Sequence, residues 1–353
     1  MKPRIRLKDI AREANVHVST VSLALRNDPR ILPGTREKIK NLARDMGYTP
    51  DAMMSALAAY RKTRRSAHGQ GELAYLTDFP AITKRTSNNV FFHCAKARAI
   101  ELGYSLEEFP LETSDFSAKR LRSIWRQRNI RGILIGPWLN PGAKFEIDWN
   151  DFAVVAFGHS TCLPGVNRTG ADQFQNMLHH LGCLRAMGYR RIGFHLLESV
   201  DIRSGGKYHA AYRYDQEKHP LKKQPGLLTH PKPSAGIFRQ WIEKNQLDCV
   251  ITHIEYRAVI ESSGFRIPGD IGFSLISRSS LNPVDLPEVS GFDERPDLLA
   301  AGAVDFLVSL IHQNNWGLSD NPKNYMILGE YYRAKTTRSS GRAKSPQIEP
   351  VRL

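Results

Sequence analysis

Apolar positions in residues 1–48 recur at helical spacing in three short stripes. The stripes are Leu7, Ile10, Ala11 and Ala14, then Val18, Val21 and Leu25, then Ile39, Leu42, Ala43 and Met46. Residues three and four apart share one face of a helix, so each stripe predicts a short amphipathic helix. Only the turn Asn15-Val16-His17 separates the first two. Pro33 and Gly47 suit the two ends of the third. The pattern predicts a helix-turn-helix unit whose second helix can enter a major groove.

The residues that precede these helices are Arg6, His17 and Leu32, and none of them is a preferred N-cap. A missing cap costs about 1 kcal/mol relative to Ser or Thr. We therefore expect an isolated head to be only marginally stable.

A short apolar face follows Pro50. Met53, Ala56, Leu57 and Tyr60 would share one side of a helix over residues 51–60, and the basic linker 61–65 comes after it. A helix this short is marginal in water unless its apolar face is covered. The segment therefore needs a partner.

From Gly71 onward, short apolar runs alternate with stretches of helical spacing. The runs that predict buried strands are 72–76, 132–135, 153–157, 191–194, 249–252 and 271–275, and the predicted helices lie near 88–102, 117–128, 171–187, 235–245, 255–263 and 297–313. Serial alternation of this kind is typical of α/β folds with parallel sheets. Such sheets bind ligands at the carboxyl ends of their strands.

The charge separates a basic head from a nearly neutral body. Residues 1–65 carry 15 Lys and Arg against 6 Asp and Glu, residues 66–332 carry 29 against 28, and residues 333–353 carry 6 against 1. This split is expected when one module meets a polyanion. Nucleic acid is the first candidate and a membrane surface the second. The head lacks the long, bulky apolar stripe of a membrane-surface helix, which favours nucleic acid.

Several classes of protein are not indicated. No apolar run reaches the roughly 18 residues of a bilayer span, and residues 1–6 lead into no signal core, so we expect a cytoplasmic, nucleoid-associated protein without a membrane partner. Four scattered cysteines form no CxxC pair. The glycine-rich stretch 69–74 precedes a strand, whereas a dinucleotide-binding turn follows one. His179 and His180 are adjacent on a helix and diverge, which disfavours metal ligation. We expect no enzyme activity, no metal and no cofactor.

Four motifs stand in the head in a specific order and spacing: Asp9-Ile10-Ala11, Val16 to Ser22, Thr35 to Lys38, and Gly47-Tyr48-Thr49-Pro50. They resemble the DNA-binding head of the lac repressor/galactose repressor (LacI/GalR) family. The resemblance implies that residues 18–25 form the recognition helix, and it assigns DNA contacts to His17, Val18, Ser19, Thr20, Leu23 and Arg26. Periodicity alone places Val18 in the core. We favour the groove because Val18 opens the helix.

The head departs from the family pattern at three of these positions. The family usually has Ser, Arg and Asn where this chain has His17, Leu23 and Arg26. An arginine can hold guanine with two hydrogen bonds, whereas leucine can meet only a thymine methyl or another apolar edge. The operator should therefore differ from that of typical members. For His17, both a solvated turn residue and a phosphate contact at an open helix N-terminus are consistent with the sequence.

Residues 51–60 resemble the family's hinge helix, which pairs across a dimer axis and pushes a leucine between base pairs in the minor groove. Leu57 occupies that position. Apolar wedges of this kind kink the duplex. A plain dimer contact is the alternative role for Leu57.

The body resembles the family's periplasmic-binding-protein-like core, which has two parallel-sheet subdomains. The resemblance implies a head over 1–50, a hinge helix and linker over 51–71, a core over 72–338 and a flexible basic tail over 339–353. Within the core it implies one subdomain of about 72–165 and 292–323 and a second of about 166–291 and 324–338, with a small effector in the cleft between them.

The resemblance also suggests residues for that cleft. Arg203 aligns with the family's effector-binding arginine, Glu255 takes the position of an acid that bonds sugar hydroxyls, and Asp78 follows the first strand. Surface salt bridges are the alternative role for such residues. Residues 166–169 show no clear family aspartate, which predicts an effector other than a common hexose.

The sequence therefore predicts a dimeric, sequence-specific transcriptional regulator, a repressor that binds palindromic double-stranded operator DNA and responds to a sugar-like effector. The alternative is an effector-independent DNA-binding regulator with a vestigial cleft.

Overall fold

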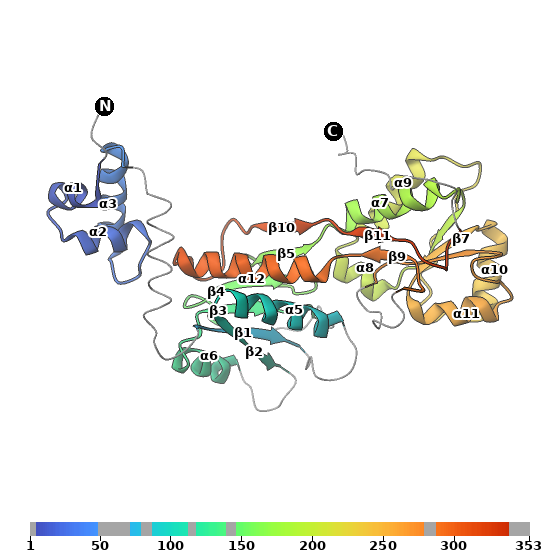
Figure 1. Ribbon diagram of the computed structural model, residues 1–353, viewed down its shortest axis with the longest axis horizontal. Helices are drawn as coiled ribbons and strands as arrows, with labels where there is room; N and C mark the ends of the chain where they lie inside the picture. The colour runs from blue at the N-terminus through green and yellow to red at the C-terminus, as the bar shows by residue number, and fades with distance from the viewer. Residues whose placement is uncertain are drawn as a thin grey trace.

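The computed structural model describes residues 5–48, 71–78, 87–111, 118–138, 146–278 and 287–338. The expected hinge helix with Leu57 and the basic tail lie outside these residues. Figure 1 shows the head (blue) beside a core of two sheets with their helices. Among the described helices, none combines the length and the apolar character that crossing a bilayer requires.

The head consists of three helices around a small apolar core. These are α1 (Leu7–Glu13), α2 (Val18–Leu25) and α3 (Pro33–Asp45). Their buried residues are Ile10, Ala11, Val21, Ala24, Ile39 and Ala43. The stripes therefore predicted the three helices and most of this core correctly, because a helical face is set by local spacing.

The caps of the head correct one expectation. His17 does cap α2, since its Nδ1 accepts a hydrogen bond from the Ser19 backbone N–H at 3.3 Å. At α1, the Arg6 backbone N–H donates to Asp9 Oδ2 at 2.8 Å, which is half of a capping box. Leu32 before α3 is 75% exposed and offers no cap. Backbone N–H groups at the starts of α1 and α2 thus have hydrogen-bond acceptors that the residue types did not suggest.

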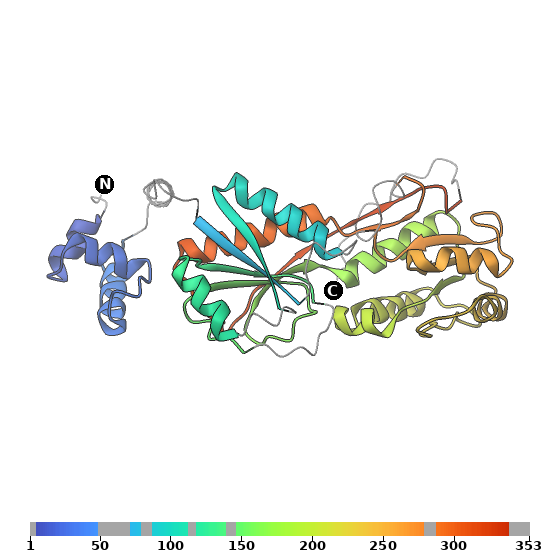
Figure 2. The same cartoon turned by 90° about the horizontal axis from the view of Figure 1, so that it is seen from below.

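The first sheet has the strand order β10-β5-β4-β3-β1-β2, and all of its pairs are parallel. The strands are β1 (Gly71–Thr77), β2 (Tyr104–Pro110), β3 (Gly132–Ile135), β4 (Ala153–Phe157), β5 (Asn167–Ala171) and β10 (Asn324–Ile327). Helices α5 (Ser87–Glu101) and α12 (Pro296–His312) cover one face, and α6 (Ala118–Gln127) covers the other (Figure 2). Apolar runs such as 132–135 are buried on both faces, as parallel sheets require.

The second sheet has the order β11-β9-β8-β7-β6. Its strands are β6 (Ile192–Phe194), β7 (Cys249–Thr252), β8 (Gly272–Leu275), β9 (Gly291–Asp293) and β11 (Glu330–Tyr332). Helices α7 (Gln173–Ala186) and α9 (Lys207–Lys218) pack on one face, and α10 (Ala235–Asn245) and α11 (Arg257–Ser262) on the other. Strand β11 is antiparallel to β9, so this sheet is mixed rather than purely parallel.

Two strands lie in the other sheet from the one expected. The expected division placed residues 166–171 and the strand near 326–329 in the second subdomain, but β5 and β10 pair with each other and belong to the first sheet. The chain passes between the sheets after β5, after β9 and after β10. A strand's own residues do not specify which sheet it joins, because pairing is a long-range contact.

The segment between β6 and β7 was also incompletely predicted. It contains α8 (Glu198–Ser204) and α9, and the sequence pattern predicted neither helix. Gly205 and Gly206 join them with φ of 65° and 73°. This left-handed conformation is easy for glycine. The two helices carry residues that matter for the site described next.

Candidate nucleic-acid interface and inter-sheet cluster

The amino end of α2 is the exposed part of the helix-turn-helix unit. His17, Val18 and Ser19 are exposed, whereas Val21 and Ala24 are buried in the head core. Val18 is 38% exposed, so it lies outside the core although its spacing fits the apolar stripe. The structure therefore leaves this end of the helix open to a ligand.

His17 organises that end. Its Nδ1 accepts from the Ser19 backbone N–H and also lies 2.7 Å from Ser19 Oγ. The first turn of α2 contains no acidic residue. A helix N-terminus carries partial positive charge and free N–H groups, which favour a phosphate oxygen. Only Nδ1 of His17 takes part in the cap, and Nε2 lies outside it. The geometry therefore suits the phosphate-contact role for His17.

Thr20, Leu23 and Arg26 follow along the same helix. Thr20 and Leu23 are half-buried. The Arg26 guanidinium folds back on α2, donating to the Ser22 carbonyl at 2.9 Å and to Ser22 Oγ at 2.8 Å. The Arg26 carbonyl also accepts from Asn314 Nδ2 at 2.7 Å, a contact between head and core. In this arrangement Arg26 is held at the carboxyl end of the helix.

Most of the head's cations face solvent. Within residues 5–48, ion pairs join Arg30 to Asp28 and Lys40 to Glu37. The exposed cations in that range without an ion pair include Lys8, Arg12, Lys38 and Arg44. Solvated, unpaired cations on a small module are available to neutralise a polyanion.

In the core, polar side chains gather where the two sheets meet. Asp78 comes directly after β1 and is 8% exposed. Arg203 lies on α8 of the second subdomain, and burial lowers its pKa while Asp78 opposes that shift. His253 comes directly after β7, and burial together with Arg203 lowers its pKa to about 4. These effects require the three groups to be near one another across the two sheets.

A second contact crosses between the sheets nearby. Lys207 Nζ, at the start of α9, donates to Nε2 of His159 in the loop after β4 at 2.6 Å. Burial, Lys207 and Arg168 lower the His159 pKa to about 4, so this imidazole stays neutral and can accept the bond. Asp172 is close enough to raise the Lys207 pKa, against burial that lowers it. We call Asp78, His159, Arg168, Asp172, Arg203, Lys207 and His253 the inter-sheet cluster.

Part of this cluster was predicted from the sequence. Asp78 and Arg203 were both suggested as effector residues, and they lie close enough for the Asp78 charge to act on the Arg203 pKa. Glu255 is exposed on the short 3-10 helix Ile254–Tyr256, and its carboxylate acts on the pKa values of His195 and Tyr256. The residue beside Arg203 is instead His253.

Five cluster members were not among the predicted effector residues: His159, Arg168, Asp172, Lys207 and His253. His159 and His253 follow buried strands, so a search of strand carboxyl ends could have found both. Lys207 had no such signal, because α9 itself was not predicted. Its position depends on the turn at Gly205 and Gly206.

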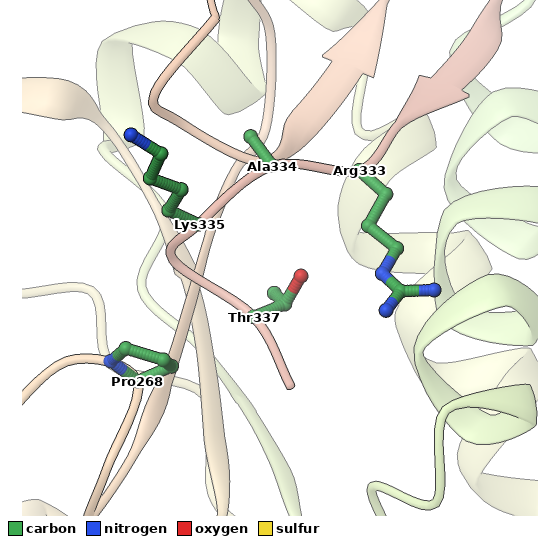
Figure 3. Close-up of a pocket in the computed structure, with 5 residues that line it drawn as sticks. All are labelled: Pro268, Arg333, Ala334, Lys335 and Thr337. Atoms are coloured by element: carbon green, nitrogen blue, oxygen red, sulfur yellow. The ribbon is translucent and has the colours of Figure 1, made fainter. Parts of the chain in front are cut away.

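A surface pocket of about 520 Å³ lies elsewhere, in the second subdomain. Its lining residues are Pro268, Arg333, Ala334, Lys335 and Thr337. Figure 3 shows Arg333 and Lys335 pointing away from each other on either side of Thr337. No residue of the inter-sheet cluster lines this pocket, and neither does any of the predicted effector residues.

Comparison with known proteins agrees with both halves of the molecule. Residues 6–51 match the bacterial regulatory proteins of the lacI family. The transcriptional regulator TreR of Salmonella typhimurium is 25% identical over 241 residues, which cover 64% of this chain and 69% of TreR. The probable transcriptional repressor ExuR of Bacillus subtilis is 36% identical over 104 residues, 29% of this chain and 28% of ExuR.

Solved structures match the fold over nearly the whole chain. The transcriptional regulator CelR in complex with cellobiose has a TM-score of 0.56 at 16% identity and covers 94% of this chain and 100% of CelR. The lac repressor dimer bound to operator and the anti-inducer ONPF has a TM-score of 0.53 at 16% identity, covering 96% and 100%. The chain thus carries the DNA-binding head of the lacI family at residues 6–51, and its α/β core has the fold of these solved transcriptional regulators.

Proposed function

We propose that this chain is a dimeric repressor whose affinity for a palindromic operator changes when a small, sugar-like effector binds in the inter-sheet cluster. The observation that carries the proposal is the position of the cluster, because its members come from both sheets. A ligand held by such residues stabilises one relative arrangement of the two subdomains over another.

The DNA half of the proposal is supported by the head. His17, Val18 and Ser19 form an exposed end of the recognition helix, with Leu23 on the same element. The unpaired cations of the head supply the phosphate contacts. Leu57 in the hinge segment would act as the minor-groove wedge and so requires a second copy of the chain across the dyad.

Strand β1 connects the proposed effector site to the hinge segment that would contact DNA. The strand begins at Gly71, where the linker from the hinge segment arrives, and Asp78 directly follows its other end. A ligand that contacts Asp78 and Arg203 therefore acts on the strand that leads to the hinge. Coupling of this kind between two sites is typically about 1 to 3 kcal/mol and must be reciprocal.

The DNA half is tested with an operator selected from a random pool of duplexes. Each phosphate contact contributes about 0.9 to the slope of log K against log salt. We expect a palindromic site, protection of both half-sites and a steep fall in affinity with salt. Affinity that does not change with salt, or protection of a single half-site, would refute a dimeric repressor.

The effector half is tested by screening sugars, sugar acids and nucleosides for thermal stabilisation of the full chain. Operator titrations with and without each hit then measure the coupling. Arg203→Ala should bind operator as the wild type does but lose the response to the effector. If the hit shifts the operator curve of Arg203→Ala fully, Arg203 is not an effector residue. If no compound both stabilises the wild type and shifts its operator curve, the effector-independent regulator is the better account.

A further inference from the structure

The head contacts the core at the carboxyl end of α12. Asn314, two residues after this helix, donates from Nδ2 to the Arg26 carbonyl at 2.7 Å. Arg26 directly follows α2, so the contact holds the carboxyl end of the recognition helix. Figures 1 and 2 both show an end of α12 facing the head. The contact joins the two parts of the chain independently of the hinge segment.

Asn314 is fixed on the core side of this contact. Its backbone has a φ of 50°, a left-handed conformation that asparagine adopts more readily than most residues. The Asn315 N–H donates to the Leu310 carbonyl at 2.9 Å, which closes the end of α12. Trp316 then packs against the core of the first subdomain. The Asn314 amide is therefore presented from a rigid part of that subdomain.

Charge favours the same contact. Helix α12 is 17 residues long, and the carboxyl end of a helix carries partial negative charge. Residues 1–65 carry 15 Lys and Arg against 6 Asp and Glu. The negative end of α12 thus faces a positively charged module, which adds an electrostatic attraction to the hydrogen bond.

The contact leaves the DNA-reading end of α2 uncovered. His17, Val18 and Ser19 remain exposed with the head in this position. The eight residues of α2 separate them from Arg26 by about 12 Å. The cations Lys8, Arg12, Lys38 and Arg44 remain exposed as well. The core therefore holds the recognition helix at one end without covering the surface that would meet DNA.

We infer that Asn314 is a positioning residue for operator binding, which holds the head on the core with the amino end of α2 free, both before and after DNA binds. This inference rests on the proposed operator binding and adds a contact that the hinge does not supply. A head that is already oriented loses less freedom when it binds, so this preorganisation raises the affinity. One hydrogen bond of this kind contributes a factor of about two to ten.

The test compares three single variants of the full chain. Asn314→Asp keeps the size and the tolerance for a left-handed backbone, but its carboxylate cannot donate and repels the Arg26 carbonyl. Asn314→Gly keeps the backbone conformation and removes the amide. Asn315→Asp is the matched control, since it places the same negative charge on the next residue, which is exposed. Thermal unfolding of each variant checks that the core is intact.

Two measurements follow the contact and its consequence. Nitrogen-15 relaxation of the head amides in the operator-free chain reports the contact, because a head held by the core tumbles slowly with it and a released head tumbles faster. We expect Asn314→Asp and Asn314→Gly to release the head and Asn315→Asp to leave it held. Operator affinity at constant ionic strength should fall about two- to tenfold in both Asn314 variants relative to Asn315→Asp.

The outcomes separate this inference from the proposed function. A wild-type head that already tumbles independently of the core would overturn the inference. Operator affinity that is unchanged or higher in the Asn314 variants would also overturn it, because the contact would then be idle or would hold the head away from DNA. A head that is released only in the Asn314 variants, in a chain that selects no operator, would keep the head–core contact and refute the proposed function.

Discussion

Acid should weaken the second subdomain through His180. This residue on α7 is 1% exposed, and its Nε2 lies 2.6 Å from Ser274 Oγ on β8. The rings of Phe292 and Tyr331 lie 5.8 and 5.2 Å from its own. Burial and the neighbouring His179 lower the His180 pKa to about 3. A buried imidazolium at this position would have no acid to compensate its charge within the contacts described.

The size of the effect follows from proton linkage. The unfolded chain holds histidine at a pKa of about 6.5, so below that pH the unfolded state binds more protons than the folded state. The stability that neutral His180 contributes is therefore complete above pH 6.5 and is lost as the pH falls towards 3. Each pH unit is worth about 1.4 kcal/mol, so the loss at pH 4.5 should be about 3 kcal/mol.

His180→Gln isolates this contribution, because glutamine does not titrate and its amide can still bond Ser274. Hydrogen exchange of the α7 and β8 amides at pH 7 and pH 4.5 gives the local free energy of opening. We expect the wild type to lose about 3 kcal/mol more than His180→Gln over this range. The titration of His253 is present in both proteins and cancels in the difference.

His93→Gln is the matched control, because His93 is exposed on α5 in the first subdomain. It should show the same pH dependence as the wild type. Parallel falls for the wild type and His180→Gln would show that His180 is not the group that titrates, and the burial argument for it would be wrong.

Three further predictions concern the head, the hinge and the first subdomain. Leu23→Arg should change the preferred base at one symmetric pair of operator positions by roughly 1 to 3 kcal/mol, and selection of the same operator by both proteins would mean that position 23 does not face the bases. Leu57→Ala should weaken operator binding and reduce DNA bending, measured by electrophoretic phasing, while sedimentation still shows a dimer; monomers would favour the dimer-contact role instead. Trp125→Ala should lower the free energy of unfolding in urea by about 3 to 5 kcal/mol, because this fully buried indole packs edge-to-face against Phe109 and Phe152. A loss below about 1 kcal/mol would contradict its place in the core.

The sequence by itself determined the elements whose pattern is local. The head helices follow from stripes such as Ile10, Ala11 and Ala14, and strands such as 132–135 and 249–252 follow from apolar runs. Such patterns suffice because the direction of a side chain depends only on the period of its own helix or strand. The basic charge of the head was equally visible, since it depends on composition alone.

Only the tertiary structure decided which sheet each strand joins and which polar groups meet. Strands β5 and β10 pair within the first sheet, although nothing in their own residues distinguishes them from strands of the second. Lys207 reaches His159 across 48 positions of the chain, from a helix that the local pattern did not indicate. His253 owes its neutral state to burial and to Arg203. Burial and electrostatic contacts depend on distances in space, and the chain crossings between the two sheets set those distances independently of local spacing.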